Sequence, residues 1–413
     1  MNFILRILLG IVLLALIELY FSKHVLNSAG NIMSDKKTIF RKLIYVILFW
    51  VNVYPIVMLI LFIYSNYSGT RIQSPENIFF DYLALYPFWL LFLLMFQSIL
   101  LFVVIDFLRL FLLPFNKKYG NELKAAQSWG VLFIAGIFIF YIPVRVVYDY
   151  YAVDVNLVEY FKQNLPEQLN GFKLVLISDI QADRYTDKQR LTNFVEKVNA
   201  AKPDLVLIAG DVITSTPDYI KTSAGFIGRI KSKFGVFACV GDHDNWAYRQ
   251  DTRRSIREIQ EALVAENVLM IDNGKKFINV DGAEIRITFV TNTYVEKIIE
   301  GVLDSLADHN LNYNLSIFLT HQPVQKLIKK ARHYNYDMFL AGHTHGGQVS
   351  FLFPFMLLSP TQFETTYVRG VFYLDDMMIY VTRGLGMSLA PVRYNSTPEI
   401  TEIIIKPKLL KLK

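Results

Sequence analysis

Hydrophobic residues are concentrated in four long runs in the first third of the chain. The runs cover residues 7–21, 43–64, 87–105 and 129–148. Each approaches the roughly 20 residues that a helix needs to cross about 30 Å of hydrocarbon. Trp50, Trp89 and Trp129 lie near run ends, where membrane interfaces favour aromatic side chains. The pattern predicts an all-α domain of about four transmembrane helices over residues 1–150. The first run, which Glu18 interrupts, also matches a cleaved signal peptide, and both interpretations stay open.

From about residue 151 the pattern changes to short apolar runs that alternate with amphipathic stretches. Alternation of this kind is typical of an α/β domain, which we expect over residues 151–413. The expected strands are 172–178, 204–210, 235–241, 285–290, 315–320 and 338–342, and the expected helices are 187–200, 217–231, 253–265 and 323–333. After Gly347 only β-rich segments follow, as if a second sheet packs on the first. Residues 149–171 form either a linker or a first edge strand.

Composition supports a membrane protein with a globular part. Of the 413 residues, 53% are hydrophobic and 19% are charged, which excludes a disordered chain. The mean hydropathy of +0.32 is high for a soluble protein. The single cysteine, Cys239, excludes an intramolecular disulfide, and its apolar strand context favours a buried side chain over a nucleophile.

The net charge of +6 is explained in part by the loops between the apolar runs. The first and third loops are basic, whereas the second carries only Arg71; the basic residues are Lys23, Lys36, Lys37, Arg41, Lys42, Lys117, Lys118 and Lys124. The positive-inside rule puts both basic loops in the cytoplasm, so we expect the following domain on the extracytoplasmic side of a plasma membrane. No nucleic-acid-binding motif is present, and no nucleic-acid partner is expected. Asp106 and Arg109 are interpreted as an ion pair at a helix end, with an intramembrane ion site as the alternative.

Five polar clusters each follow a predicted strand. They are Ser178-Asp179-Ile180-Gln181, Gly210-Asp211, Gly241-Asp242-His243-Asp244, Thr320-His321 and Gly342-His343-Thr344-His345. In open α/β sheets the loops after the strands converge on one crevice, so these side chains are predicted to meet. A single Asp there is often only a helix cap, and a lone His is often a core residue. Five coincidences favour a shared site.

In this order the clusters resemble the calcineurin-like metallophosphoesterase family, whose pattern runs D-x-H, G-D, G-N-H-D/E, H and G-H-x-H. The resemblance covers about residues 157–405, and residues 382–386 and 391–393 are similar to a membrane-anchored or exported bacterial branch. It implies an α/β (α+β) fold, a four-layer α-β-β-α sandwich of two mixed sheets, behind the transmembrane bundle. It also implies two metal ions and hydrolysis of a phosphomonoester or phosphodiester by a metal-bridging hydroxide.

Carried over by position, the resemblance assigns roles to individual residues. Asp211 would bridge the two ions. The first ion would also bind Asp179, Gln181 and His345, and the second Asp242, His321 and His343. His243 would remain free to contact a phosphoryl oxygen or to protonate the leaving group.

Three positions depart from the common pattern. Gln181 replaces a histidine, Asp242 an asparagine, and Thr214 an acid that often orients the catalytic histidine. The first two changes make the ligand set harder and more anionic, which favours Mn²⁺ or Mg²⁺ while leaving Zn²⁺ and Fe possible. Asp244 either substitutes for the missing acid or braces its loop.

The expected substrate contacts are Arg393, Arg249 and Trp246. Four spans exceed what an anchor requires, so a lipid- or envelope-linked phosphate ester and the lipid bilayer are the expected partners. The competing hypothesis is a non-catalytic membrane scaffold or sensor whose metal site has drifted, which the departures at Gln181, Asp242 and Thr214 favour.

Overall fold

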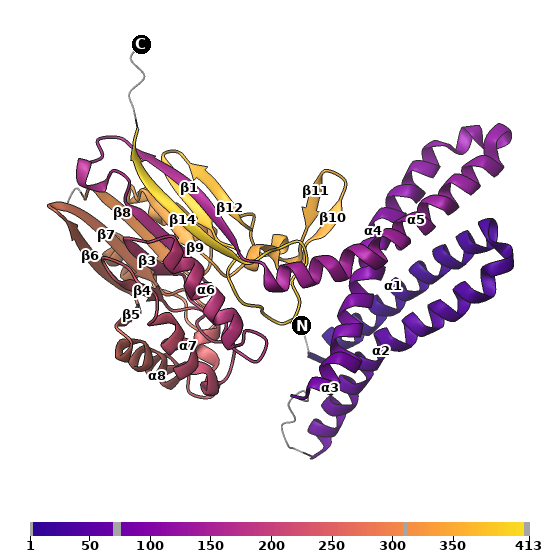
Figure 1. Cartoon of the computed structure of the whole chain (residues 1–413), viewed down its shortest axis with the longest axis horizontal. Helices are drawn as coiled ribbons and strands as arrows, with labels where there is room; N and C mark the ends of the chain where they lie inside the picture. Colours follow the sequence, from indigo (N-terminus) through magenta and orange to yellow (C-terminus); the bar gives the residue numbers. More distant parts are fainter. Residues whose placement is uncertain (1–2, 69–75, 309–312, 409–413) are drawn as a thin grey trace, which may run out of the picture. The chain divides into compact units, whose positions relative to one another are not determined.

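The computed structural model describes residues 3–68, 76–308 and 313–408, so Arg71 lies outside the described residues. Contacts divide the chain into two units (Figure 1). One, here called the helical unit, comprises Met1–Val146 and Phe351–Leu357. The other, the sandwich unit, comprises Val147–Ser350 and Leu358–Lys413.

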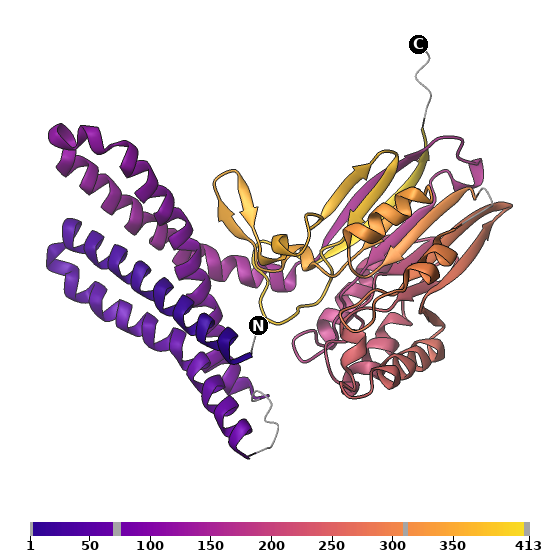
Figure 2. The same ribbon diagram turned by 180° about the vertical axis from the view of Figure 1, so that it is seen from behind.

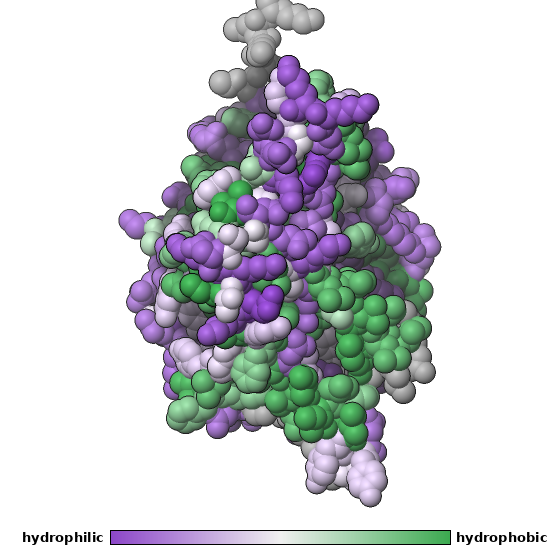
Figure 3. All heavy atoms as spheres, turned by 90° about the vertical axis from the view of Figure 1, so that its right-hand side faces the viewer, coloured by the Kyte–Doolittle hydropathy of each residue, from purple (hydrophilic) through white to green (hydrophobic). Residues whose placement is uncertain are grey.

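Four long helices form most of the helical unit. They are α1 (Phe3–Ile32), α2 (Lys37–Ser68), α4 (Tyr86–Phe111) and α5 (Asn116–Tyr151), and the short α3 (Ile78–Phe80) and a π-helical turn (Asp81–Leu85) lead into α4. All four are long and apolar enough to cross a membrane, which confirms the predicted helical region. Phe21 of α1, Val51 of α2 and Phe102 of α4 are buried between them. Many outward side chains are apolar and exposed, and Figure 3 shows hydrophobic residues gathered in a broad region of the face drawn.

A short hairpin from late in the chain belongs to this unit. Its strands are β10 (Phe351–Phe353) and β11 (Met356–Leu358). The side-chain amide of Gln97 in α4 donates to the carbonyl of Leu352 and accepts from its N–H, both at 2.8 Å. The rings of Phe96 and Phe351 lie 4.6 Å apart. The boundary expected at residue 151 would place this segment in the second domain, whereas its contacts group it with the helices.

Two six-stranded mixed sheets form the centre of the sandwich unit. The first has the order β1-β14-β2-β3-β4-β5 and the second β12-β13-β9-β8-β7-β6. In the first, β2 to β5 run parallel and β14 runs antiparallel to β2. In the second, β7, β8, β9 and β13 run parallel. The bounds are β1 (Asp154–Lys162), β2 (Lys173–Ile177), β3 (Leu205–Ile208), β4 (Val236–Cys239), β5 (Val268–Ile271), β6 (Gly274–Val280), β7 (Ala283–Val290), β8 (Leu315–Thr320), β9 (Met338–Ala341), β12 (Gly370–Leu374), β13 (Met377–Val381) and β14 (Glu399–Pro407).

Helices cover both outer faces of the paired sheets. The helices α6 (Lys188–Ala200), α7 (Ile220–Ile227) and α8 (Thr252–Ala265) pack on the first sheet, and α9 (Glu300–Ala307) and α10 (Gln325–His333) pack on the second, whose helix-covered face is seen in Figure 2. Between the sheets lies an apolar core that includes Leu207, Phe289 and Leu319. The predicted four-layer α-β-β-α sandwich is confirmed.

The expected division into an early and a late sheet is wrong. Strands β6 to β9 precede Gly347 yet belong to the second sheet, and β14, the last strand, returns to the first sheet. Apolar runs predict that a strand is buried, but they carry no information on which neighbour it pairs with. Of the two alternatives for residues 149–171, the edge strand is found, because β1 pairs only with β14 among the described strands.

Candidate metal centre

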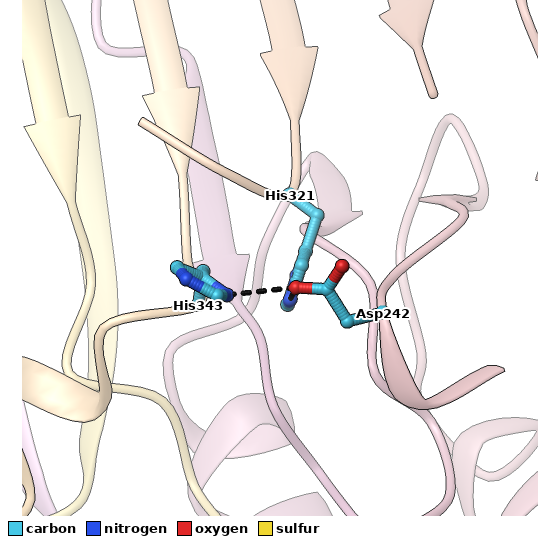
Figure 4. A group of neighbouring side chains, drawn as sticks. All are labelled: Asp242, His321 and His343. Carbon is cyan, nitrogen blue, oxygen red and sulfur yellow. Dashed lines mark ion pairs between the residues drawn. The ribbon is translucent and has the colours of Figure 1, made fainter. Parts of the chain in front are cut away.

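The loops that follow β2, β3, β4, β8 and β9 bring the predicted ligands together. One group of possible metal ligands comprises Asp242, His321 and His343, and a second comprises Asp179, Asp211 and His321. Within each group, the potential ligand atoms lie within 4.8 Å of one another. Figure 4 shows the imidazoles of His321 and His343 directed at the Asp242 carboxylate. Five segments that are distant in sequence therefore form one site.

The backbone at this site is held in an unusual conformation. Asp179, Gln181, Asp211, His343 and His345 have φ values of 49°, 44°, 59°, 72° and 50°. Side chains other than glycine rarely adopt this left-handed region, and such residues cluster where the surrounding structure fixes a functional geometry. The loops also approach one another closely, because a Cβ atom on Gly241 would lie 2.2 Å from the backbone nitrogen of Asp211. Close packing of the loops therefore holds these side chains in the conformation in which they meet.

Polar atoms in the first predicted site remain without hydrogen-bond partners. Oδ1 of Asp179 and Oε1 of Gln181 are buried and accept no hydrogen bond within the described parts of the chain. The Gln181 amide donates to Oδ2 of Asp211 at 3.1 Å, and Nε2 of His345 lies 3.5 Å from Oδ1 of Asp179. Buried oxygen atoms without a donor are costly, and a cation would satisfy them.

The second predicted site contains a histidine whose tautomer suits a metal. Nδ1 of His321 donates to the carbonyl of Ala209 at 2.7 Å, so the neutral ring presents a lone pair on Nε2. That nitrogen lies 3.3 Å from Oδ2 of Asp211 and 3.4 Å from Oδ2 of Asp242. Nδ1 of His343 lies 2.9 Å from Oδ2 of Asp242. A backbone carbonyl that fixes the far ring nitrogen is the usual support of a metal-binding histidine.

The charges of the site also suit a cation. Burial opposes ionisation of Asp211, but the imidazoles of His321 and His243 hold its pKa at about 2. Burial likewise opposes ionisation of Asp242, and hydrogen bonds from His321 and His343 outweigh it, so its pKa is below the usual range. Burial lowers the pKa of His343, but its contacts with Asp242 and Glu364 raise it to about 9. The two carboxylates therefore favour positive charge beside them, either a proton on an imidazole or a bound cation.

Four residues outside the predicted set support Asp242, two of them directly and two through Gln322. Nε2 of Gln322 donates to both carboxylate oxygens, at 3.0 and 2.9 Å, and the backbone N–H of Tyr294 donates at 2.6 Å. Asn292 and Lys297 in turn donate to the side-chain oxygen of Gln322, at 3.0 and 3.2 Å. These donors stabilise a carboxylate at a position where the family usually carries an amide.

Glu364 is a further residue that the sequence reasoning missed. Its Oε1 lies 3.0 Å from Nε2 of His343, and the hydroxyl of Tyr294 donates to the same carboxylate. This carboxylate therefore fixes the ring nitrogen of His343 that faces away from Asp242. Beside these residues lies a cavity of about 340 Å³, lined by Gln322, Pro323, Val324, Gln325, His343, Glu364, Thr365 and Thr366.

His243 is held beside the ligands by backbone groups. Its Nδ1 donates to the carbonyl of Thr214 at 2.5 Å, and its own N–H donates to Oδ1 of Asp211 at 2.8 Å. Nε2 lies 3.1 Å from the hydroxyl of Ser388. The sequence lacks the acid that the family often carries at position 214. The backbone carbonyl of Thr214 accepts the hydrogen bond from His243 instead. Trp246 packs edge-on against His243 with ring centroids 4.5 Å apart, and exposed Arg249 lies over the Trp246 ring.

Asp244 braces the loops and does not contact His243. Its carboxylate accepts from the backbone N–H groups of Asp211, Val212 and Gly241 at 3.0, 2.8 and 2.8 Å. Burial and the charge of Asp211 nevertheless raise the pKa of Asp244 to about 7. Of the two roles considered for this residue, the geometry fits loop bracing.

Arg393, expected as a substrate contact, is 0% exposed. Its guanidinium donates to the carbonyls of Gly386, Ser396 and Arg383 at 2.8, 3.0 and 3.0 Å, and to Nδ1 of His345 at 3.2 Å. Burial and this guanidinium keep the pKa of His345 well below its usual value. The arrangement fits a residue that positions His345. Among the predicted ligands, His345 has the least suitable hydrogen bonding, because the neutral ring then carries its proton on Nε2.

The structure defines an α/β protein with two mixed sheets and a cluster of acidic and imidazole groups at the strand ends, and comparison with known proteins specifies the family. The sequence profile of the calcineurin-like phosphoesterases matches residues 172–347. An uncharacterized metallophosphoesterase of Bacillus subtilis, YkuE, is 30% identical over 59% of this chain and 82% of its own length. The chain belongs to the calcineurin-like phosphoesterase family.

Other relatives extend the likeness to membrane proteins. A transmembrane protein with metallophosphoesterase domain from Danio rerio is 29% identical over 59% of this chain and 55% of that protein, and one from Bos taurus is 27% identical over 61% and 57%. Among solved structures, a phosphopantetheinyl hydrolase from Mycobacterium tuberculosis aligns over 55% of this chain and 96% of that chain, with 12% identity and a TM-score of 0.34.

Proposed function

We propose that this protein is a membrane-anchored, two-metal phosphoesterase. The observation that carries the proposal is the meeting of five strand-end loops, whose buried Asp179 Oδ1 and Gln181 Oε1 lack hydrogen-bond partners within the described chain. The four apolar helices support anchoring in a bilayer. The charge of their connecting loops supports a sandwich unit on the extracytoplasmic side of a plasma membrane.

Each cation would have its own set of ligands. Asp179, Gln181 and His345 would hold the first, and Asp242, His321 and His343 the second. Asp211 would bind both, in keeping with the 3.3 Å between its Oδ2 and Nε2 of His321. When bound, two divalent cations polarise a phosphoryl oxygen and lower the pKa of a water molecule, so that hydroxide is available to attack phosphorus. Four carboxylate or amide oxygen donors favour Mn²⁺ or Mg²⁺ over Zn²⁺ or Fe.

His243 is the proposed catalytic acid. Because Nδ1 donates to the Thr214 carbonyl, the reactive nitrogen is Nε2. A proton on Nε2 can pass to the leaving-group oxygen when the ester bond breaks. Trp246 limits the movement of the ring through its edge-on contact, and Arg249 adds positive charge beside it for an anionic substrate.

Exposed apolar side chains adjoin the site and support an amphiphilic substrate. Leu389, which follows Ser388, is 100% exposed and has a φ of 62°, and Phe363, which precedes Glu364, is 97% exposed. Isolated apolar side chains on a surface are common, but two at full exposure beside groups that contact His243 and His343 favour a substrate with an apolar portion. A phosphate ester linked to a lipid fits both features.

Activity of the full chain in detergent micelles tests the proposal. With Mn²⁺ it should hydrolyse an aryl phosphodiester or monoester, and Asp211→Asn should reduce turnover by about 10³-fold or more, because that change weakens both metal sites. Asp218→Asn removes a carboxylate from an exposed position in the same segment and should leave turnover unchanged. Absence of turnover with Mn²⁺, Mg²⁺, Zn²⁺ and Fe²⁺ alike would refute the proposal and favour a non-catalytic scaffold.

The substrate class is tested separately. Leu389→Ser should raise KM for a lipid phosphate presented in mixed micelles while leaving kcat/KM for a small aryl ester within about twofold, since only the former needs apolar contact. Equal effects on both substrates would refute an apolar subsite. Protease added outside intact cells should cleave the sandwich unit, and full protection would reverse the proposed orientation.

A further inference from the structure

The helical unit contains a polar cavity unrelated to the metal centre. Its volume is about 560 Å³, and it lies where α1 and α4 end and α2 and α5 begin. The lining side chains come from all four long helices: Lys23 and His24 of α1, Lys37 of α2, Asp106 and Arg109 of α4, and Lys124 of α5. A cavity with this lining is unusual between helices that otherwise expose apolar residues.

Positive charge predominates in this cavity. Among the described residues that line it, Asp106 is the only acidic one. The hydroxyl of Tyr20 and Nε2 of His24 lie 2.7 and 2.9 Å from Oδ2 of Asp106, and the Gln127 amide donates to its Oδ1 at 2.8 Å. The carboxylate therefore already has partners of its own. Arg109, which the sequence analysis paired with Asp106, donates to the side chain of Gln127.

The three lysines of the cavity have no such partners. Within the described chain, the ammonium groups of Lys23, Lys37 and Lys124 make no ion pair. Lys37 lies across α1: its Nζ is 3.7 Å from the point where a Cβ of Gly30 would stand, so the missing side chain leaves room for it. Lys23, Lys37 and Lys124 are exposed to solvent, and like charges that converge on one cavity favour an anion there.

We propose that this cavity binds the phosphate headgroup of an anionic phospholipid. The lysines come from the ends of helices that span a bilayer in the proposed function, which is the depth at which headgroups lie. Basic pockets between transmembrane helices on the cytoplasmic side bind anionic headgroups, and the loops that adjoin this cavity are those predicted to be cytoplasmic. The acyl chains would extend along the exposed apolar faces of the same helices. The proposal depends on membrane insertion, but not on phosphoesterase activity.

The test measures lipid binding by the full chain in detergent micelles. Native mass spectrometry reports bound phosphatidylglycerol against phosphatidylcholine, which has the same chains and no net charge. The variant Lys23→Gln/Lys37→Gln/Lys124→Gln should bind phosphatidylglycerol on the order of 100-fold more weakly, because each lysine near a headgroup contributes about a fivefold factor. The matched control Lys36→Gln/Lys42→Gln/Lys117→Gln removes the same charge from equally exposed positions that do not line the cavity, and it should change affinity by less than about threefold.

A second variant keeps every charge and reduces the space. Gly30→Leu places a side chain where Lys37 lies and should also displace phosphatidylglycerol. Equal losses in the two triple variants would overturn the proposal, since they would indicate diffuse attraction. Equal binding of phosphatidylcholine would also overturn it. Displacement of the lipid by inorganic phosphate at similar concentration would identify a soluble anion as the ligand instead. Hydrolytic activity should be unchanged in all three variants, so failure here is distinguishable from failure of the proposed enzyme.

Discussion

Gln322 offers the sharpest test of how the metal centre is held together. Its amide nitrogen donates to both oxygens of Asp242, and its own oxygen is fixed by Asn292 and Lys297. Replacement by methionine preserves length and removes both functions. A hydrogen bond to a charged group contributes about 1.5–3 kcal/mol. At about 1.4 kcal/mol per factor of ten, loss of this support should weaken binding of the second cation by roughly 10- to 150-fold.

The full chain is titrated with Mn²⁺, and binding is monitored by the electron paramagnetic resonance signal of the free ion or by calorimetry. At saturating Mn²⁺ the turnover of Gln322→Met should recover to within about tenfold of the wild type, because Gln322 contacts a ligand and not the metal. Gln163→Met, at an exposed position after β1, is the matched control and should bind Mn²⁺ normally.

A double-mutant cycle distinguishes a direct contact between Gln322 and Asp242 from a general structural effect of the substitution. In an Asp242→Asn background the amide of Gln322 no longer faces a carboxylate, so Gln322→Met should have a much smaller effect there. Unchanged Mn²⁺ affinity in Gln322→Met, or the same loss in both backgrounds, would refute the assignment of Gln322 as the residue that positions Asp242.

Four further results are expected. Gln181→His should shift metal preference toward Zn²⁺, since imidazole replaces an oxygen donor, and an unchanged profile in a metal-selectivity assay would exclude Gln181 as a ligand. Mn²⁺ affinity should fall about tenfold for each pH unit below about 9, because His343, with a pKa of about 9, must lose a proton to bind; pH-dependent calorimetry with a flat profile would contradict this. Thr214→Ala should retain turnover within about threefold, because the backbone carbonyl orients His243; a loss above a hundredfold would show that the hydroxyl is required. Arg393→Met should lower the free energy of unfolding by about 3 kcal/mol or more, seen as a reduced Tm, because four acceptors lose a buried donor.

The elements that the sequence predicted well are those whose signal is strong and local. The central strands β2, β3, β4, β8 and β9 are buried, mostly apolar runs, and a polar cluster follows each of them. Strands β5 and β6 were missed because they are partly exposed, with alternating burial that resembles a loop in so short a segment. Sheet membership was also missed, since pairing depends on connections that hydrophobicity does not encode.

Within the candidate site, residue type predicted ligands better than supporting contacts. Gln322 follows directly after His321, so its position was a usable signal, whereas Glu364 follows a short 3₁₀ segment, Pro360–Phe363, and not one of the predicted strands. The role of Thr214 could not be predicted, because the group that orients His243 is its backbone carbonyl, which every residue has. Arg393 has a charge typical of an anion-binding residue, but burial decides its position, and burial depends on the whole fold.

The hairpin at Phe351–Leu357 limits where this protein can be divided. A fragment that starts at residue 151 would keep the hairpin but lose Gln97 and Phe96. The backbone N–H and carbonyl of Leu352 and the ring of Phe351 would then face solvent. An exposed strand edge of this kind can pair with another copy of the chain. Expression of the sandwich unit alone should therefore yield aggregates, unless those seven residues are replaced by a short polar linker.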